Sequence, residues 1–385
     1  MKYCKKCLYP DTKPYIEFDE NGVCNACNKS KQKHAKESID WGERKKEFEK
    51  ILDWVKSQNS PFYDVMVPVS GGKDSITQVS RVLNKGLRIL AVNVDYGIKT
   101  EIGKENLEVI PKMGVNLIII RPNMKIHKKL IKIGLEEYGD PDLLSHTMLH
   151  AYPLHIALRF KVPLCLLGEN SAFEYGGDEK LAKLNHITKE WFLKYAANKG
   201  LTADVVSKKY GFGMDKLWQY DYPKDLDNNT NIKAIFSSYY FKWDSNEHLR
   251  IAKQYGFKEL DEPREGTYRT FVGIDEMINR LHQYIKVLKF GYGRATDHAC
   301  EDIRLGLISR DEAIKLVRKY DLMPLGKEYI DKICEFLGYE KDEFIKILEK
   351  FRNKNIWKKD KNGNWYITEF ENKFGFRGEF INENI

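Results

Sequence analysis

Residues 63–75 read Tyr-Asp-Val-Met-Val-Pro-Val-Ser-Gly-Gly-Lys-Asp-Ser, an apolar run followed directly by a glycine turn. The apolar run predicts a buried strand, and we expect a helix to begin at Lys73. Paired glycines allow backbone N–H groups to curl around phosphate oxygens, and the N-terminus of a helix adds positive potential. Lys73 supplies a mobile cation. The stretch therefore predicts a nucleotide site, whereas the simpler alternative is a Gly-Gly turn that only joins a strand to a helix.

The spacing of the glycine turn distinguishes it from the Walker loop. Walker loops follow G-x-x-x-x-G-K-[ST] and support transfer of the γ-phosphate, and residues 70–75 do not fit that pattern. They resemble S-G-G-x-D-S, the pyrophosphate loop (PP-loop) of the ATP pyrophosphatase superfamily. This resemblance implies that ATP is cleaved between its α and β phosphates while a substrate oxygen becomes adenylylated. The residues expected to contact ATP are Ser70, Gly71, Gly72, Lys73, Asp74 and Ser75. The last three are also the catalytic candidates.

Strands and helices alternate on both sides of this loop. The expected strands are 64–69, 88–94, 115–120 and 162–167, with a fifth inside 232–240, and the expected helices include 31–60, 73–84 and 100–113. Apolar strands separated by helices form βαβ units, so we expect an α/β fold with a doubly wound parallel sheet. The PP-loop resemblance implies that this sheet is HUP-like. The predicted domains are a zinc knuckle with a linking helix (1–60), a PP-loop ATP pyrophosphatase domain (61–260) and a mainly helical, substrate-binding C-terminal region (261–385).

Two further strand ends carry residues suited to ATP. Asp95 follows the second expected strand, and Gly168 and Glu169 follow the fourth. Ligands of open parallel sheets bind beyond the carboxyl ends of the strands, so we expect all three residues near the nucleotide. The alternative for Asp95 is a helix cap. Glu169 either helps to hold Mg²⁺ or caps the helical segment that follows it.

Four of the seven cysteines form two Cys-x2-Cys pairs separated by sixteen residues. These four are Cys4, Cys7, Cys24 and Cys27. The spacing is typical of a four-thiolate zinc site, and because four thiolates leave no open position we expect Zn²⁺ to be structural. Two disulfides are the alternative, but nothing in the sequence indicates export. The isolated cysteines, expected to pack in the interior, are Cys165, Cys300 and Cys334.

Charge and hydropathy exclude several classes of protein. The chain has 385 residues and a net charge of +8, but its lysines are spread throughout. This distribution indicates a solvated lysine-rich surface, so we do not expect a nucleic-acid partner. No apolar stretch approaches the roughly 18 residues of a membrane span, and no apolar run follows the first residues as in a signal peptide. We therefore expect a cytoplasmic protein with no membrane partner.

A second group of chemically active residues lies in 286–312, where a Gly-Tyr-Gly segment precedes charged residues at helical spacing. Arginines in such a group suit bidentate capture of a phosphate or carboxylate. The candidates for substrate binding in this segment are Tyr292, Arg294, Asp297, His298, Asp302 and Arg304. The loop 173–179 adds Glu174 and Tyr175, placed to close over a substrate. The alternatives are a solvated helix for the first segment and a surface turn for the second.

Together these motifs resemble one family, the N-acetyl sugar amidotransferases of bacterial surface-polysaccharide and flagellin-glycan biosynthesis, which include the pseudaminic acid and O-antigen acetamidino enzymes. The resemblance covers nearly the whole chain. It rests on the two cysteine pairs, the PP-loop, Gly168-Glu169-Asn170-Ser171, Glu174-Tyr175-Gly176-Gly177 and Phe290-Gly291-Tyr292-Gly293-Arg294-Ala295-Thr296-Asp297-His298.

The resemblance implies conversion of an N-acetyl group on an amino sugar, which is expected to be nucleotide-linked, to an acetamidino group. The amide oxygen would attack the α-phosphorus of ATP and release pyrophosphate, and ammonia would then displace AMP from the O-adenylyl imidate. An amide is a poor electrophile, which is why ATP is needed. Lys73, Mg²⁺ and the amides of the turn would stabilise charge on the departing pyrophosphate.

The source of ammonia follows from the cysteines. A glutaminase needs an activated cysteine, but position 2 is lysine and Cys165 lies in an apolar strand. We therefore expect a separate glutaminase subunit, and the resemblance implies one like the class I glutaminase of histidine biosynthesis. One alternative is a tRNA-modifying PP-loop enzyme that thiolates or aminates an adenylylated base, although Cys165 and Cys300 do not form the reactive pair of thiolating relatives. Another is a non-catalytic zinc-ribbon adaptor, which the intact Lys73-Asp74-Ser75 disfavours.

Overall fold

The computed structural model describes residues 1–33, 39–174 and 178–374. They form two compact units, each with its own core. The first, which we call the sheet unit, comprises Asp40–Glu259 and Gly273–Glu276. The second, the terminal unit, comprises Met1–Ile39, Leu260–Val272 and Met277–Ile385. The domain boundaries at residues 60 and 260 stay a prediction; by packing, the helix that follows residue 40 belongs with the sheet.

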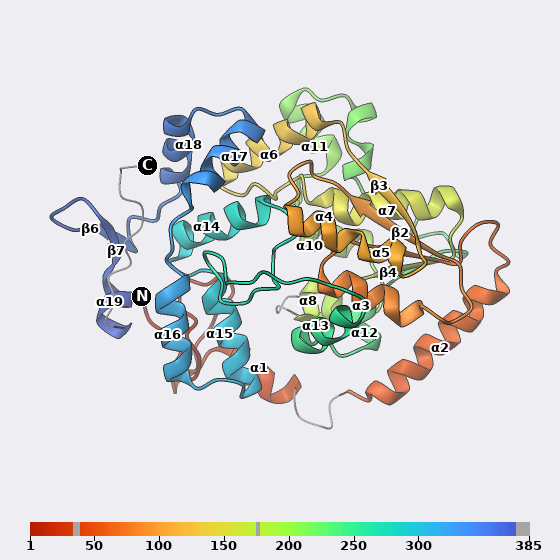
Figure 1. Ribbon diagram of the computed structural model, residues 1–385, viewed down its shortest axis with the longest axis horizontal. Coiled ribbons are helices and arrows are strands. Elements are labelled where there is room, and N and C mark those ends of the chain that lie inside the picture. The colour runs from red at the N-terminus through yellow and green to blue at the C-terminus, as the bar shows by residue number, and fades with distance from the viewer. Residues whose placement is uncertain (34–38, 175–177, 375–385) are drawn as a thin grey trace. The chain divides into compact units, whose positions relative to one another are not determined.

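The sheet unit contains a five-stranded sheet in which every pairing is parallel (Figure 1). Its order is β3-β2-β1-β4-β5. The bounds are β1 Val65–Pro68, β2 Ile89–Val94, β3 Asn116–Ile120, β4 Leu164–Leu167 and β5 Lys233–Phe236. The chain moves outward from β1 to β3 and then returns to the other side of β1, so the order reverses between β1 and β4. The α/β fold with a doubly wound parallel sheet is confirmed, and ligands of such sheets bind at this reversal.

Helices cover both faces of the sheet, and the central strands β1, β2 and β4 are buried, whereas β3 at one edge is partly exposed. On one face Met66, Leu90 and Cys165 share a core with Leu154 and Trp191 from two helices. The helices of this unit are α2 Trp41–Ser57, α3 Lys73–Val82, α4 Glu101–Leu107, α5 Val109–Lys112, α6 Met124–Tyr138, α7 Thr147–Phe160, α8 Ser171–Glu174, α9 Glu179–Ala182, α10 Lys189–Tyr195, α11 Ala203–Tyr210, α12 Ser237–Tyr240 and α13 Ser245–Gln254. Two 3₁₀ turns, η1 Met214–Lys216 and η2 Trp218–Tyr220, follow α11. Helix α7 contacts β1, β2 and β4, whereas α3 packs against β1, α5 and α13.

Two predicted helices differ from those observed. The helix expected over 31–60 is α2, which begins at Trp41 because Asp40 accepts a hydrogen bond from the N–H of Glu43 and caps it; residues 34–38 lie outside the described residues. The helix expected over 100–113 is split into α4 and α5. Pro111 explains the break, because it has no N–H for the carbonyl of Leu107 and its ring crowds that carbonyl.

The terminal unit is mainly helical, as expected for the C-terminal region. Its helices are α1 Asn25–Lys33, α14 Ile278–Phe290, α15 Arg294–Leu305, α16 Arg310–Tyr320, α17 Lys327–Leu337, α18 Lys341–Glu349 and α19 Thr368–Phe374. A short antiparallel pair, β6 Trp357–Lys359 and β7 Trp365–Ile367, precedes α19. Within the described ranges, no helix is both long and apolar enough to span a membrane.

Candidate functional site

The glycine turn joins the end of β1 to the start of α3. Gly71 has φ +90°, and a Cβ on it would lie 2.8 Å from the backbone nitrogen of Leu107 at the end of α4. Gly72 is extended (φ −68°, ψ 159°) and is the N-cap of α3 with no side-chain hydrogen bond. The first N–H groups of a helix have no partner within the helix and carry positive potential. Only glycine fits at position 71, and the turn presents a helix N-terminus of the kind that binds phosphate.

Both serines of the loop stabilise the turn itself. The Ser70 hydroxyl accepts a hydrogen bond from the N–H of Gly72 at 3.1 Å. The Ser75 hydroxyl donates to the carbonyl of Gly72 at 2.9 Å and accepts from the N–H of Gly71 at 3.2 Å. These bonds fix the loop in one conformation, which lowers the entropy lost when a ligand is positioned.

The charged residues of the loop form a chain of contacts. Lys73 Nζ lies 2.8 Å from Asp74 Oδ2, and the other oxygen of Asp74 is 2.7 Å from Nδ1 of His248 on α13. His248 is fully buried, and its Nε2 lies 3.0 Å from a guanidinium nitrogen of Arg81. Burial favours the neutral form of Asp74, but Lys73 and His248 outweigh it and hold the pKa of this carboxyl below its usual range. Asp74 therefore carries a negative charge and orients Lys73 at the loop.

His248 and Arg81 are site residues that sequence reasoning missed. Arg81 also donates to the hydroxyl of Ser237, which directly follows β5, and its guanidinium lies 4.4 Å from the ring centroid of Phe241. His248 is 174 residues from Asp74 in sequence and belongs to no motif. Only the packing of α13 against α3 brings the two side chains together.

The other two predicted strand ends lie at the same edge of the sheet as the loop, because β2 and β4 flank β1 in parallel. Asp95 is 5% exposed and accepts hydrogen bonds from the N–H of Gly97 at 2.8 Å and from Arg121 Nε at 3.1 Å. Burial favours the neutral form of Asp95, but the hydrogen bonds from Arg121 and from the Gly97 amide outweigh this effect. The pKa of Asp95 is therefore lowered, and the carboxyl is ionised.

At the end of β4, a Cβ on Gly168 would lie 3.3 Å from Nε2 of Gln78 on α3, so a larger residue would press on that helix. Glu169 follows directly, and Asn170 anchors the segment: its N–H donates to the Ser238 hydroxyl at 2.9 Å and its side-chain oxygen accepts from the Trp191 indole at 2.8 Å. Among the described residues, the side-chain oxygens of Gln78 and Asn93 are buried without a hydrogen-bond partner. Unsatisfied polar atoms beside a glycine cradle fit a polar ligand such as ATP at this edge.

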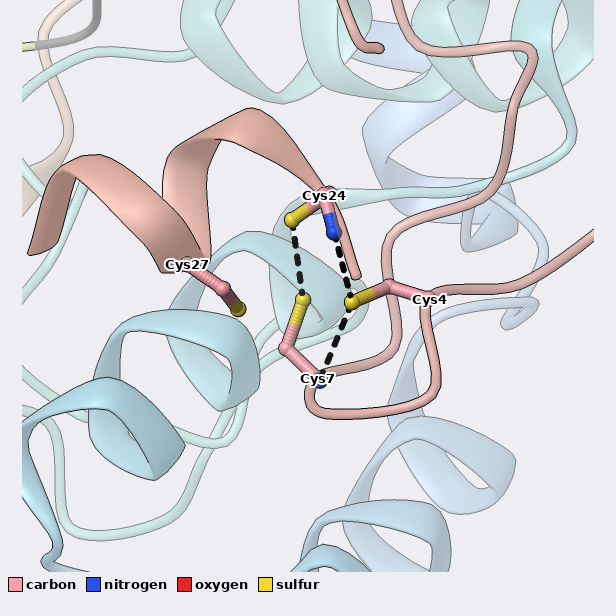
Figure 2. Close-up of side chains that lie close together, drawn as sticks. All are labelled: Cys4, Cys7, Cys24 and Cys27. Carbon is pink, nitrogen blue, oxygen red and sulfur yellow. Dashed lines mark hydrogen bonds between the residues drawn. The ribbon is translucent and has the colours of Figure 1, made fainter. Parts of the chain in front are cut away.

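The four N-terminal cysteines form a buried cluster (Figure 2). Their sulfur atoms all lie within 4.8 Å of one another, and Cys7 Sγ is 3.7 Å from Cys24 Sγ. Tetrahedral zinc with Zn–S bonds of about 2.3 Å separates its sulfurs by about 3.8 Å. The Sγ of Cys4 also accepts N–H groups of Cys7 (3.4 Å) and Cys24 (3.2 Å), as a thiolate would. The donor set thus fits a structural Zn²⁺ held by Cys4, Cys7, Cys24 and Cys27.

This cluster, with the turns around it, packs on the helices at the other end of the chain. The N–H of Leu8 donates to Cys300 Sγ at 3.3 Å, and Arg310 Nε donates to the carbonyl of Cys7 at 3.3 Å. Cys300 is buried as expected, but against the cysteine knuckle. Burial lowers the pKa of the Arg304 guanidinium, yet Tyr9 and the thiols of Cys300 and Cys7 together raise it. Arg304 thus lies beside the knuckle, 5.5 Å from the ring centroid of Tyr9.

The remaining residues of the predicted substrate cluster are held by partners within the terminal unit. Asp297 pairs with Lys286 and accepts from the Tyr9 hydroxyl at 3.2 Å, with Arg294 3.7 Å away. His298 Nδ1 is 3.0 Å from the Thr267 hydroxyl, Asp302 lies 2.6 Å from Arg269, and the ring of Tyr292 packs edge-on against Tyr9. Tyr292, His298 and Asp302 are buried. Glu174 ends α8 in the sheet unit, and Tyr175 lies outside the described residues.

Comparison with known proteins finds a match to a family model for one region of the chain. Residues 265–371 match the model of the C-terminal domain of LPS biosynthesis protein WbpG-like proteins. Among solved structures, NMN synthetase from Francisella tularensis matches at 16% identity with a TM-score of 0.27, covering 56% of this chain and 93% of that one. NH3-dependent NAD synthetase from Campylobacter jejuni matches at 15% identity with a TM-score of 0.27 and the same coverage. No curated protein sequence matches the chain significantly.

Proposed function

We propose that the chain is an ATP-dependent amidotransferase that acts on an N-acetyl amino sugar, on the premise that residues 265–371 match the C-terminal domain of WbpG-like LPS biosynthesis proteins. The product would be an acetamidino sugar for a surface polysaccharide. The observation that carries the proposal is the glycine loop at the carboxyl edge of a parallel sheet, with Lys73 and Asp74 at the start of its helix, in a chain that also matches the WbpG-like domain.

The chemistry that the loop supports is activation of the amide oxygen. That oxygen attacks the α-phosphorus of ATP, the bond between the α and β phosphates breaks, and pyrophosphate leaves. Lys73 and the N-terminus of α3 would stabilise the charge on the departing group, and Asp74 would keep Lys73 in place. Mg²⁺, when bound, would neutralise phosphate charge, and its acidic ligands are to be sought at the strand ends that carry Asp95 and Glu169.

Ammonia would then add to the imidate carbon, and AMP would leave. The described cysteines outside the knuckle offer no glutaminase nucleophile: Cys165 is fully buried in β4, and burial raises the pKa of its thiol well above the ordinary value. Burial also raises the pKa of Cys334. A partner glutaminase therefore belongs to the proposal.

The test is incubation with a panel of N-acetylated sugars, ATP, Mg²⁺ and ammonium, followed by mass spectrometry of the sugar and chromatography of the nucleotides. We expect an amidine together with AMP and pyrophosphate, and we expect glutamine to replace ammonium only when a separate glutaminase is added. ADP and orthophosphate in step with product would refute the mechanism. A thiolated or aminated tRNA, with no amidine from any sugar, would favour the tRNA-modifying alternative.

A further inference from the structure

Two arginines in the terminal unit, one buried and one half-buried, form no ion pair among the described residues. Arg280 on α14 is 4% exposed, and one of its terminal nitrogens donates to the carbonyl of Met323 at 3.1 Å. Arg264 is half-buried and donates to the carbonyl of Glu265 at 3.3 Å. The Nε atoms of both side chains are buried and have no hydrogen-bond partner among the described residues. Neither guanidinium forms an ion pair within the described part of the chain.

The positive charges of Arg280 and of a third arginine, Arg294, act on the guanidinium of Arg264. Burial lowers the pKa of Arg264, and the positive charges of Arg280 and Arg294 lower it further. Tyr329 and the charge of Glu265 only partly offset them, so the pKa of Arg264 is about 10. Burial lowers the pKa of Arg280 as well, whereas the charges of Glu265 and Asp321 raise it. Asp321 is already engaged, since its oxygens accept hydrogen bonds from the N–H groups of Gly293 (2.7 Å) and Thr296 (3.1 Å).

The backbone beside Arg280 is fitted to its guanidinium. Gly266 has φ +81°, and a Cβ on it would lie 2.9 Å from a terminal nitrogen of Arg280. The N–H of Gly266 donates to the carbonyl of Tyr320 at 3.1 Å, which fixes this loop against α16. The fold therefore holds like charges together at a site where an unpaired buried charge costs free energy. Such an arrangement is stabilised when an anion binds between the charges.

We propose that Arg264 and Arg280 form an anion subsite for the substrate, which binds either a phosphate group or a carboxylate carried by the N-acetyl sugar. Both groups present two oxygens that match the guanidinium fork. Arg294, at the start of α15 and 33% exposed, adds a third positive charge nearby. The inference rests on the proposed function for the identity of the ligand, but the subsite is testable without catalysis.

The experiment is isothermal titration of the full chain with two probes, UDP and glucuronate, in the presence of saturating α,β-methylene-ATP so that the PP-loop is occupied. We expect the wild type to bind one probe, and Arg264→Ala to weaken that binding about tenfold or more because a charge-assisted pair is lost. Arg264→Lys should restore part of the affinity. The matched control is Lys315→Ala, an exposed cation on α16 of the same unit, which should change the affinity less than about twofold. Binding of UDP alone identifies phosphate, and binding of glucuronate alone identifies a carboxylate.

Chemical labelling of the wild type gives a second measurement that does not depend on a folded variant. Phenylglyoxal should modify Arg264, and the bound probe should protect it. Equal labelling with and without probe, binding of neither probe to the wild type, or equal affinity in Arg264→Ala would overturn the subsite. If the subsite binds its probe as expected but no N-acetyl sugar is amidated, the proposed function fails while the subsite stands. If a sugar is amidated but Arg264→Ala binds the probe as the wild type does, the subsite fails while the proposed function stands.

Discussion

Replacement of His127 tests how burial close to the carboxyl edge of the sheet controls stability. His127 on α6 is fully buried, its Nδ1 lies 3.0 Å from the Tyr220 hydroxyl, and its ring contacts that of Tyr96, which follows Asp95. Its Nε2 has no hydrogen-bond partner among the described residues. A protonated ring would therefore carry a buried N–H without an acceptor. Burial accordingly lowers the pKa of His127 from 6.5 to about 4, although the charge of Asp95 acts in the opposite direction.

The sign of the pH effect follows from this shift. Between pH 6.5 and 4 the unfolded chain binds a proton that the folded chain does not bind, so stability falls as the pH falls. The stability that the folded protein gains from a neutral His127 is fully present above pH 6.5 and is lost as the pH falls towards 4. A shift of this size corresponds to about 3 kcal/mol in total, of which about 2 kcal/mol is lost between pH 7 and pH 5.

The assay is urea unfolding followed by tryptophan fluorescence at several pH values from 7 to 5. His127→Gln stays neutral, so we expect the stability of the wild type relative to this variant to fall by about 2 kcal/mol across the range. The control is Tyr220→Phe, which removes the hydrogen bond but keeps the imidazole and should retain the pH slope of the wild type. Parallel pH profiles for the wild type and His127→Gln would refute the reasoning.

Three further outcomes are expected. Lys73→Ala should lower turnover by about two orders of magnitude because charge on the leaving pyrophosphate loses its cation, whereas Lys85→Ala, which only breaks an ion pair with Glu49, should not; steady-state kinetics decides. Gly71→Ala should lower the free energy of unfolding of the sheet unit by more than the roughly 1–3 kcal/mol expected from backbone strain, because the added Cβ also meets the backbone of Leu107. Gly86→Ala is the control, because Gly86 has a positive φ but open space around it. Thermal unfolding should show the strain alone for this control. The purified protein should contain about one zinc per chain, lost on replacing Cys4 and Cys24 by serine, and metal analysis that finds zinc retained would contradict the site.

The local features of the site could be predicted because each is encoded within a few residues. Continuous apolar runs mark the buried strands, the paired glycines mark the turn, and two Cys-x2-Cys pairs mark the knuckle. Parallel pairing then places the ends of β1, β2 and β4 at one edge. Pro111 indicates a break in the helix expected over 100–113, but the apolar periodicity of that segment favoured one continuous helix.

The long-range contacts could not be predicted from one sequence. His248 meets Asp74 only because α13 packs on α3, and nothing near either residue signals the pair. Helical spacing grouped Arg304 with His298 and Asp302, but spacing does not say what the face touches, and Arg304 lies against Tyr9 and the cysteines. Arg264 and Arg280 likewise come from separate segments, and only the structure shows that the Nε atom of each is buried without a hydrogen-bond partner among the described residues.

The terminal unit is assembled from segments that are far apart in the sequence and are therefore synthesised at different times. The Thr12 hydroxyl donates to the carbonyl of Phe290 at 2.5 Å, and Leu8 reaches Cys300, so the knuckle is docked by residues synthesised nearly three hundred positions later. Residues 40–259 are complete before those helices emerge, and domains generally fold as units during synthesis. We therefore expect the apolar side of the nascent knuckle to stay uncovered, with bound metal as its main stabiliser, until α14 and α15 have left the exit tunnel. Zinc supply during translation, rather than after it, would then set the yield of folded protein.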